Sequence, residues 1–302
     1  MTAHIAVLGT GKMGSAIARR LADLDPGIAL WNRTPERAQQ RHLGRVAPTA
    51  AEAVRGADVV ISCLTGPAAI RAAYLARGGA LETRTAAVYV EMSTAGAAAA
   101  ELAPLVEQAG GRLVEAPILG APALVVAGRA AILVGGDGAD VDRVAPILER
   151  LGEVHRVGPL GSASRLKLVA NSMLATVVVA AAELQVAGEE AGLDPAQVFW
   201  VLARLAPVLE PRRAGYLEDR HEPAQFTVRD LRKDLDLALG ILGGSTGTLP
   251  VTSLVRSQVD AATADWGNLD ITAMIRSCRA ARAGTPGPDR SPGGATEPPR
   301  RD

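Results

Sequence analysis

The sequence predicts an α/β domain built on an open, mostly parallel sheet, followed by an all-helical domain that a long helix joins to the first. In the first half, short runs rich in Val, Ile and Leu alternate with longer Ala-rich segments of helical period. These runs are continuously apolar, as expected for strands covered by helices on both faces. After residue 161 the short runs stop and one long helical segment begins.

The first predicted domain spans residues 1–160. Its strand candidates cover residues 4–8, 28–31, 59–64, 87–92, 112–116, 130–134 and 154–157. Because Ala-rich segments of helical period separate them, the domain shows the strand–helix alternation of a parallel α/β sheet.

The second predicted domain spans residues 161–283 and is helical. It opens with a helix over residues 162–191, ended by Gly192 in the position of a C-cap glycine. The apolar stretch 168–182 is shorter than the ~20 residues of a membrane span and contains Asn171, so we expect a buried helix. Residues 284–302, rich in Pro and Gly without periodicity, predict a disordered tail.

Composition excludes several kinds of function. The 302 residues are 48% hydrophobic and 21% charged, and Lys+Arg equals Asp+Glu at 32 each, which argues against a disordered polyelectrolyte and a nucleic-acid partner. The two cysteines, Cys63 and Cys278, are far apart, so we expect neither a disulfide framework nor a metal. A first strand from His4 leaves no room for a signal peptide, and we expect a cytoplasmic protein without a membrane partner.

A glycine-rich turn follows the first predicted strand. Gly9, Gly11 and Gly14 in VLGTGKMG form GxGxxG, with Lys12 and Met13 between the last two glycines. The bare pattern is weak, since a chain with 32 glycines produces it by chance roughly 0.3 to 0.4 times. Its position between a strand and an Ala-rich helix indicates dinucleotide binding, with the pyrophosphate at the helix N-terminus.

The end of the second predicted strand indicates which dinucleotide is bound. NAD would require an acidic residue there, but the sequence reads LWNRTPER, with Asn32, Arg33 and Thr34 at this point and Arg37 one turn later. A guanidinium suits a 2′-phosphate and no carboxylate repels it, so NADPH is predicted. The alternative is a solvated arginine pair in an arginine-rich chain.

Lysines are scarce, which makes each one informative. The chain has 29 arginines but only three lysines, Lys12, Lys167 and Lys233. Lys167 and Asn171 are four residues apart and share one helix face, so both can reach one substrate oxygen. A desolvated lysine can release a proton to an oxygen that becomes negative during hydride transfer, whereas arginine effectively cannot. The alternative is a Lys167 that merely solvates the start of the helix.

Five ordered motifs resemble one family. GTGKMG, EMST, EAPILGA, GSASRLKLVAN and FTVRDLRKDLDLAL are similar to those of the β-hydroxyacid dehydrogenases, a family of 3-hydroxyisobutyrate dehydrogenases, glyoxylate and succinic semialdehyde reductases and related imine reductases. The resemblance spans residues 4–280. It implies a doubly wound Rossmann domain and an all-α domain joined by a long helix, in dimers or tetramers that pack through the helical domains. Lys167 matches the catalytic lysine of the family.

The resemblance implies further site residues. Ser93 and Thr94 of EMST would contact the nicotinamide and substrate, with N-capping of the next helix as the alternative. Leu64 and Thr65, in the loop CLTGP, occupy the position that contacts the cofactor ribose.

Three residues of the predicted helical domain match positions that close the site in the family. These are Phe226, Lys233 and Asp234. Lys233 and Asp234 could equally form an ion pair on a helix surface.

The substrate loop departs from the family pattern DxPVSGG. The sequence EAPILGAP has Leu119 in place of the serine and Ala121 in place of the second glycine, while Gly120 remains. A missing hydroxyl beside a carboxylate costs about 1 to 3 kcal/mol, so these changes argue against 3-hydroxyisobutyrate and for a bulkier or less polar substrate.

These features predict an NADPH-dependent reductase of a small-molecule aldehyde or keto acid, with Lys167 as proton donor. The alternatives are an imine reductase, although imine reductases usually lack the lysine, and a non-catalytic NADPH-binding module that keeps the fold for oligomerisation or sensing.

Overall fold

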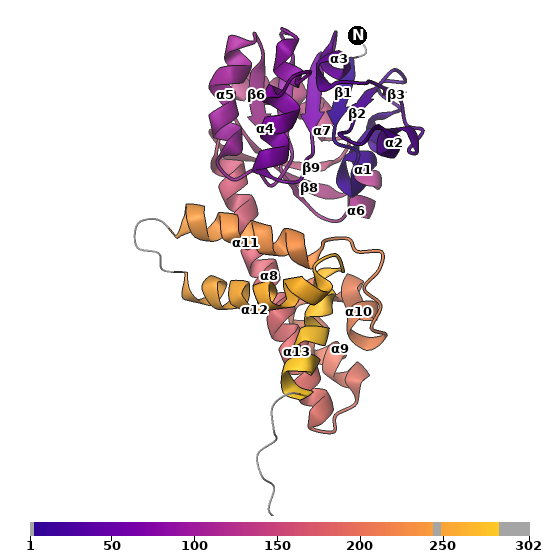
Figure 1. The fold of residues 1–302 in the computed structure, drawn as a ribbon, viewed down its shortest axis with the longest axis vertical. Helices are drawn as coiled ribbons and strands as arrows, with labels where there is room; N and C mark the ends of the chain where they lie inside the picture. Colours follow the sequence, from indigo (N-terminus) through magenta and orange to yellow (C-terminus); the bar gives the residue numbers. More distant parts are fainter. Residues whose placement is uncertain (1–2, 244–248, 284–302) are drawn as a thin grey trace, which may run out of the picture.

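The chain folds into two parts that one helix connects. The structure is a computed structural model and describes residues 3–243 and 249–283. Figure 1 shows the α/β part at one end, the helical part at the other, and α8 (Ser162–Glu190) running from the first into the second. The tail predicted for residues 284–302 lies outside the described residues.

The α/β part is built on one nine-stranded sheet. Its strands are β1 (Ile5–Leu8), β2 (Ala29–Trp31), β3 (Arg45–Val46), β4 (Val59–Ser62), β5 (Val88–Glu91), β6 (Arg112–Glu115), β7 (Ile118–Leu119), β8 (Ala130–Gly135) and β9 (Gly152–Gly158). They lie in the order β3-β2-β1-β4-β5-β6-β8-β7, and β9 pairs with β8. The first six strands are mutually parallel, whereas β8 runs antiparallel to β6 and β7. The predicted open, mostly parallel sheet is therefore confirmed.

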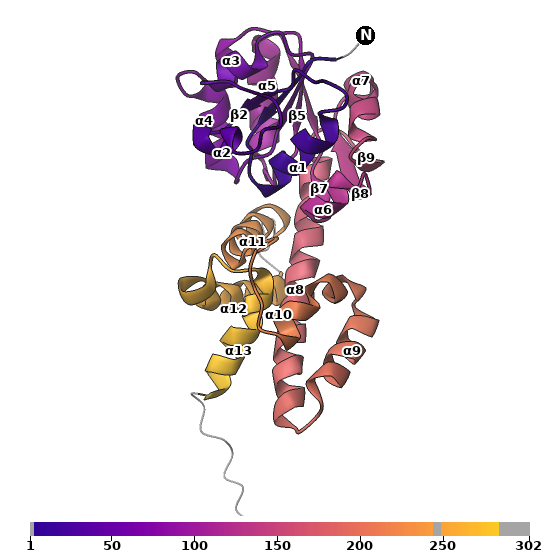
Figure 2. The same ribbon diagram turned by 90° about the vertical axis from the view of Figure 1, so that its right-hand side faces the viewer.

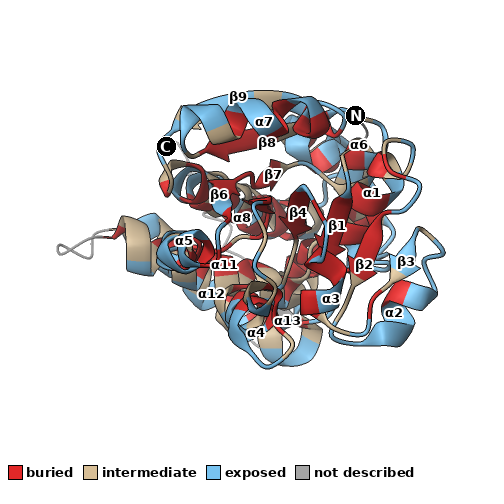
Figure 3. Cartoon of the chain, turned by 90° about the horizontal axis from the view of Figure 1, so that it is seen from above, coloured by how far each residue is buried: buried red, intermediate tan, exposed pale blue. Residues whose placement is uncertain are grey.

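Helices cover both faces of the sheet. They are α1 (Lys12–Leu21), α2 (Pro35–Gln39), α3 (Ala50–Val54), α4 (Pro67–Leu75), α5 (Ala98–Gln108), α6 (Pro122–Val126) and α7 (Gly138–Leu148). Successive residues of β1 belong to opposite cores: Val7 packs in the cluster that includes residues of α1 and α7, and Leu8 in the cluster that includes residues of α3, α4 and α5. The central strands β1 and β4 are buried along their whole length (Figure 3), as expected for strands covered on both faces, whereas the edge strands β3 and β9 are largely exposed.

The predictions missed two short strands. β3 and β7 have two residues each, too few for periodicity to indicate a strand. Each exists because it pairs with a longer neighbour, β3 with β2 and β7 with β8. The structure also ends β4 at Ser62, two residues before the predicted end.

The second half of the chain is a helical bundle around α8. The remaining helices are α9 (Pro195–Leu205), α10 (Arg213–Leu217), α11 (Val228–Leu242), α12 (Pro250–Trp266) and α13 (Met274–Ala283). Gly192 adopts a φ of +85° just after α8, as expected for a helix-ending glycine. Apart from an isolated bridge between Thr227 and Asp270, the described residues of this half form no strand.

α8 is the axis of the helical core. By length and composition it is the one helix in the described part that could cross a membrane, and 44% of its most apolar window is buried inside the protein. Residues such as Val178 and Val186 of α8 pack with Leu231 of α11 and Val259 of α12 in one cluster. Figure 2 shows α11 between this bundle and the α/β part, where it faces the ends of the strands.

Candidate active site between the two domains

The carboxyl ends of the parallel strands form the edge of the sheet that faces the helical domain. The chain leaves β1, builds β2 and β3 on one side, and then returns to place β4 on the other side of β1. Ligands of open α/β sheets bind outside the carboxyl ends at such a reversal. Here the loop after β1 touches the loop after β4: a Cβ on Gly9 would lie 2.3 Å from the carbonyl oxygen of Cys63.

The glycine turn has the shape of a phosphate cradle. Gly9 has a φ of +98°, and a Cβ on Gly14 would lie 1.8 Å from the Gly9 oxygen, so both glycines are required by close backbone packing. Gly11 is different, because a Cβ there would meet nothing within 4 Å. Gly11 is the N-cap residue of α1 and has no side-chain capping bond, and the nearby buried hydroxyl of Thr10 has no hydrogen-bond partner among the described residues. Uncapped N–H groups beside open space fit a dinucleotide pyrophosphate.

The predicted 2′-phosphate residues divide into two groups. Asn32 is used by the protein itself, since its Oδ1 accepts from the Thr10 N–H at 3.1 Å and its Nδ2 donates to the Thr34 carbonyl at 2.9 Å. Arg33 and Arg37 are exposed, and neither side chain forms an ion pair or hydrogen bond with a described residue. The two guanidinium groups are therefore uncommitted beside the end of β2.

The side chains of two residues of the glycine turn contact other parts of the protein. The Lys12 ammonium donates a hydrogen bond to the carbonyl of Ala224, in the loop ahead of α11, and so connects the two domains. Met13 is half-buried and packs against the sheet core. Both were predicted near the cofactor, and the structure places their side chains against protein.

Lys167 lies in the second turn of α8 with its amine turned inward. Its Nζ donates to the carbonyl of Ile118 at 2.7 Å. Burial lowers the pKa of the Lys167 ammonium below its usual value, and the nearby Asp234 carboxylate acts in the opposite direction. An ammonium held in this way gives up a proton more readily than one in water, as proton donation near neutral pH requires.

Asn171 and Asp234 are paired beside this lysine. Asn171 Nδ2 donates to Asp234 Oδ2 at 2.5 Å, which leaves the second amide hydrogen and the amide oxygen of Asn171 for other partners. Asp234 is only 2% exposed, and burial raises the pKa of its carboxyl while Lys233 lowers it. α8 and α11 thus bring Lys167, Asn171 and Asp234 together.

Lys233 reaches from the helical domain to the sheet domain. Its Nζ is 2.7 Å from Asp234 Oδ1, and its side chain lies so close to Gly66 that a Cβ on that glycine would be 3.1 Å from Lys233 Cδ. Gly66 belongs to the CLTGP loop, which also contains Leu64 and Thr65. The Lys233 side chain therefore contacts the sheet domain, and its ion pair with the buried Asp234 is not a solvated pair on a helix surface.

Ser93 is buried at the end of β5 and holds the neighbouring loop. Its Oγ accepts from the Leu64 N–H at 2.7 Å, and its own N–H donates to Glu91 Oε1 at 2.8 Å. Neither Ser93 nor Thr94 caps the next helix, because α5 has Ala97 in its N-cap position. Thr94 is half-buried in the same loop.

Sequence reasoning missed two buried carboxylates beneath the site. Glu91 accepts from Ser62 Oγ at 2.7 Å, and burial raises the pKa of the Glu91 carboxyl to about 7. Glu115, on the next strand, accepts from Gly161 N–H and Ser164 Oγ. A signal for both was present, since each is an acidic residue at the end of a run of buried, largely apolar strand residues.

The predicted substrate loop follows β7 next to Lys167. Leu119 is half-buried and pairs with Ala131 of β8, Gly120 has a φ of +143°, and Ala121 is the N-cap residue of α6. Phe226, in the loop ahead of α11, is half-buried and packs against the core of the helical domain. The structure thus brings the substrate loop next to the lysine.

The described residues contain no cluster of His, Cys, Asp or Glu that could hold a metal ion.

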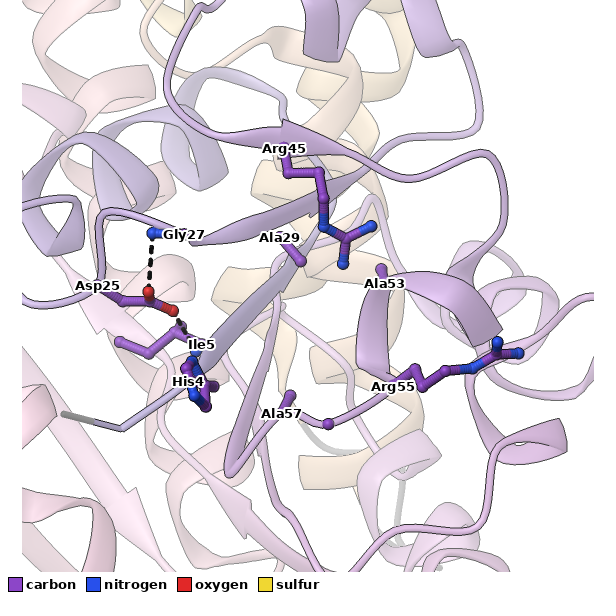
Figure 4. A pocket seen from close by; sticks show the side chains of 10 residues that line it. His4, Ile5, Asp25, Gly27, Ala29, Arg45, Ala53, Arg55 and Ala57 are labelled. Atoms are coloured by element: carbon purple, nitrogen blue, oxygen red, sulfur yellow. Dashed lines mark hydrogen bonds between the residues drawn. The ribbon is translucent and has the colours of Figure 1, made fainter. Parts of the chain in front are cut away.

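A cavity of about 240 Å³, shown in Figure 4, is lined by Asp25, Arg45 and Arg55 among others. It includes His4 at the start of β1, so it lies at the opposite end of the strands from the glycine turn. There Asp25 Oδ1 and Oδ2 accept from the N–H groups of Gly27 and Ile5, which fixes the first turn of the sheet.

The fold is a doubly wound domain whose open glycine turn lies on the side of the helical domain that carries Lys167. This arrangement defines a nicotinamide-dependent oxidoreductase. Residues 4–161 match the family model described as the NAD binding domain of 6-phosphogluconate dehydrogenase, and residues 161–278 that described as "NAD-binding of NADP-dependent 3-hydroxyisobutyrate dehydrogenase". The chain belongs to the β-hydroxyacid dehydrogenase family, as its five motifs predicted, and is an NAD(P)-dependent oxidoreductase similar to hydroxyacid dehydrogenases.

Individual relatives cover nearly the whole chain. An uncharacterized oxidoreductase of Synechocystis sp. is 31% identical over 270 residues, which are 84% of this chain and 90% of that protein. The structure of Mycobacterium tuberculosis 3-hydroxyisobutyrate dehydrogenase with L-serine has a TM-score of 0.79 at 28% identity, covering 92% of this chain and 100% of that one. The structure of Psf3 with NADP+ and 2-OPP has a TM-score of 0.81 at 26% identity, covering 90% and 99%.

Proposed function

We propose that the protein uses NADPH to reduce an aldehyde or keto group to a hydroxyl, with Lys167 as the proton donor. The observation that carries this proposal is the partly buried Lys167 amine, held by the Ile118 carbonyl and close enough to Asp234, the partner of Asn171, for that carboxylate to act on its pKa. The bound reduced nicotinamide would supply a hydride to the carbonyl carbon.

The residues of this chain would handle the oxygen. Lys167 has three N–H groups, of which Ile118 takes one, so the ammonium can hold the substrate oxygen and pass it a proton as the hydride arrives. The remaining amide hydrogen of Asn171 can hold the same oxygen. Asp234 keeps Asn171 oriented and opposes the loss of the Lys167 charge, and solvent then returns a proton to the neutral amine.

NADPH oxidation against a panel of carbonyl and imine compounds tests this reaction. The panel contains glyoxylate, succinic semialdehyde, methylglyoxal, larger keto acids and cyclic imines. We expect turnover of a carbonyl compound, and Lys167→Arg should lower kcat roughly 100-fold or more, because arginine keeps the charge but does not release a proton. Reduction of imines alone, or full activity in Lys167→Arg, would contradict the proposal. Binding of NADPH without any turnover would favour the non-catalytic module.

The preference for NADPH is supported by the uncommitted Arg33 and Arg37 and by the absence of an acidic residue at the end of β2. Arg33→Asp should raise the KM for NADPH much more than the KM for NADH, because a carboxylate repels the 2′-phosphate. Arg41→Asp is the matched control, since Arg41 is exposed nearby and undergoes the same charge change. Equal effects on both cofactors would refute the assignment of the phosphate site.

We also propose that the protein is a homodimer or homotetramer joined through the helical domain. α8 exposes Leu166, Val169, Met173 (63% exposed) and Leu184, and α9 exposes Trp200. Leu166, Val169 and Met173 are spaced by three and four residues and so share one face of α8, and an exposed apolar face is typical of an interface. Met173→Glu should reduce the mass measured by sedimentation to that of a single chain, whereas a single-chain mass for the unaltered protein would refute the proposal.

We further propose that the protein acts in the cytoplasm on a small-molecule substrate and has no nucleic-acid or membrane partner. The balance of 32 basic and 32 acidic residues argues against binding to nucleic acid or an anionic membrane. Co-sedimentation with anionic vesicles or retention on DNA at low salt would contradict it.

A further inference from the structure

Two buried carboxylates face each other beneath the candidate site. Glu91 of β5 and Glu115 of β6 are paired in the register of the sheet, and each is at most 1% exposed. Neither forms an ion pair with a residue of the described chain. Because a buried carboxylate without hydrogen bonds is strongly unfavourable, the groups that donate to each one show what it holds in place.

The donors to Glu115 both come from the start of α8. The Gly161 N–H donates to Oε2 at 2.6 Å, and the Ser164 hydroxyl donates to Oε1 at 2.5 Å. Gly161 is the N-cap residue of α8 and has no side chain to cap the helix. Glu115 therefore caps α8 from a neighbouring strand, with its negative charge at the positive end of the helix.

The segment that contains Glu115 holds α8 through a further hydrogen bond. Ile118, three residues after Glu115, accepts the hydrogen bond from Lys167 Nζ. Lys167 is three residues after Ser164 and shares its face of α8. Residues 115–118 thus hold the first two turns of the helix at two points, which fixes the rotation of α8 about its own axis.

We propose that Glu115 is a positioning residue that aims Lys167 at the reacting oxygen, an inference that rests on the proposed function. Both Lys167 and Asn171 lie on the part of α8 that Glu115 anchors. A rotation of about 10° at roughly 8 Å from the helix axis would move the amine by more than 1 Å. A displacement of about 1 Å can lower a reaction rate roughly 100-fold.

Glu91 provides a matched control, because it is the same residue type at the cross-strand position but holds different groups. Its donors are Ser62 Oγ and Ser93 N–H, on the side of the glycine turn, and α8 supplies none of them. Removal of the charge at Glu91 should therefore disturb cofactor binding, and removal of the charge at Glu115 should disturb the lysine.

The test compares Glu115→Gln and Glu91→Gln in the full chain. Glu115→Gln should lower kcat roughly 10- to 100-fold while the Kd for NADPH, measured by its fluorescence, stays within about twofold. Glu91→Gln should weaken NADPH binding more than it lowers kcat. Equal kcat losses in the two variants, or an unchanged kcat in a folded Glu115→Gln protein, would overturn the proposal.

A second readout requires no substrate. Since the chain has three lysines, a protein labelled with ¹³C-lysine gives three side-chain signals, and that of Lys167 is the one missing in Lys167→Arg. Loss of a nearby negative charge would lower the pKa of the Lys167 ammonium, whereas a less buried position would raise it, so the direction of the shift caused by Glu115→Gln distinguishes a change of position from lost charge.

The Lys167 signal tests the positioning role of Glu115 separately from the proposed function. In Glu115→Gln its titration should move toward the usual value of 10.5, while Glu91→Gln leaves it unchanged. If Glu115→Gln does not fold, Ser164→Ala removes one of the two donors and should give a smaller shift in the same direction; no shift would overturn the proposal. If the titration moves as expected but the unaltered protein reduces no compound, the positioning role stands and the proposed function fails.

Discussion

The glycine turn allows a sharp test, because two of its glycines serve different purposes. A Cβ on Gly14 would lie 1.8 Å from the Gly9 carbonyl oxygen, whereas real Cβ contacts essentially never fall below 3.0 Å. In Gly14→Ala the start of α1 must therefore move away from β1 by roughly 1 Å. The obstructing atom belongs to the backbone, so the cost should approach the upper end of the ~1–3 kcal/mol found for overpacking.

That cost converts into a measurable melting temperature. At roughly 2 to 4 °C per kcal/mol for a domain of this size, Gly14→Ala should lower Tm by about 6 to 12 °C in thermal unfolding followed by circular dichroism. Gly11→Ala should leave Tm nearly unchanged, because its φ of −65° suits alanine and a Cβ there meets nothing within 4 Å.

Gly11→Ala, which should leave Tm nearly unchanged, should nevertheless weaken cofactor binding. A methyl group on Gly11 would stand where the pyrophosphate approaches the backbone, and loss of one hydrogen bond to a charged group costs about 1.5 to 3 kcal/mol. NADPH fluorescence should therefore show a Kd at least roughly 10-fold weaker for Gly11→Ala. The reasoning fails if Gly11→Ala melts as early as Gly14→Ala, or if it binds NADPH like the unaltered protein.

Three further results are expected. Asp234→Asn removes a carboxylate that raises the pKa of Lys167, so the basic limb of the pH profile of kcat/KM should move to lower pH; the same shift in Asp236→Asn, an exposed acid on the same helix, would argue against this cause. The pKa of Glu91 is raised from 4.5 to about 7, so its contribution to stability is complete below pH ~4.5 and is lost as the pH rises to about 7. Urea unfolding should show that Glu91→Gln abolishes this decline, worth at most about 3 kcal/mol, and an unchanged slope would contradict the assignment. Leu119→Ser should improve turnover of small 3-hydroxy acids by restoring a hydroxyl to the loop, and steady-state kinetics without any gain would leave the loop interpretation unsupported.

Whether the role of a site residue could be predicted depended on how far away in the chain its contact partners lie. The spacing of Gly9, Gly11 and Gly14 was readable because a turn and the helix after it are local structure. Arg33 was placed at the end of β2 for the same reason. The use of Asn32 as a bridge between two loops was not predicted, since its partner Thr10 belongs to another strand end, 22 residues away.

The periodicity of the sequence could not predict contacts between residues that are far apart in the chain. Lys12 reaches Ala224 across 212 residues, Asn171 reaches Asp234 across 63, and Glu115 holds Gly161 across 46. The contacts of Lys12 and Glu115 depend on how the helical domain sits against the sheet, and that of Asn171 depends on how α11 packs against α8; no local pattern encodes either arrangement. Phe226 packs against the helical core through contacts that its motif does not show.

The sequence by itself determined the alternation of strands and helices, the glycine turn, the long helix that carries Lys167, and the family. These follow from burial patterns and backbone requirements that operate over a few neighbouring residues. Only the tertiary structure decided where the amine of Lys167 points and which carboxylates hold its helix. Hydrogen bonds of buried polar groups join residues that are distant in the chain, so they exist only once the two domains are in place.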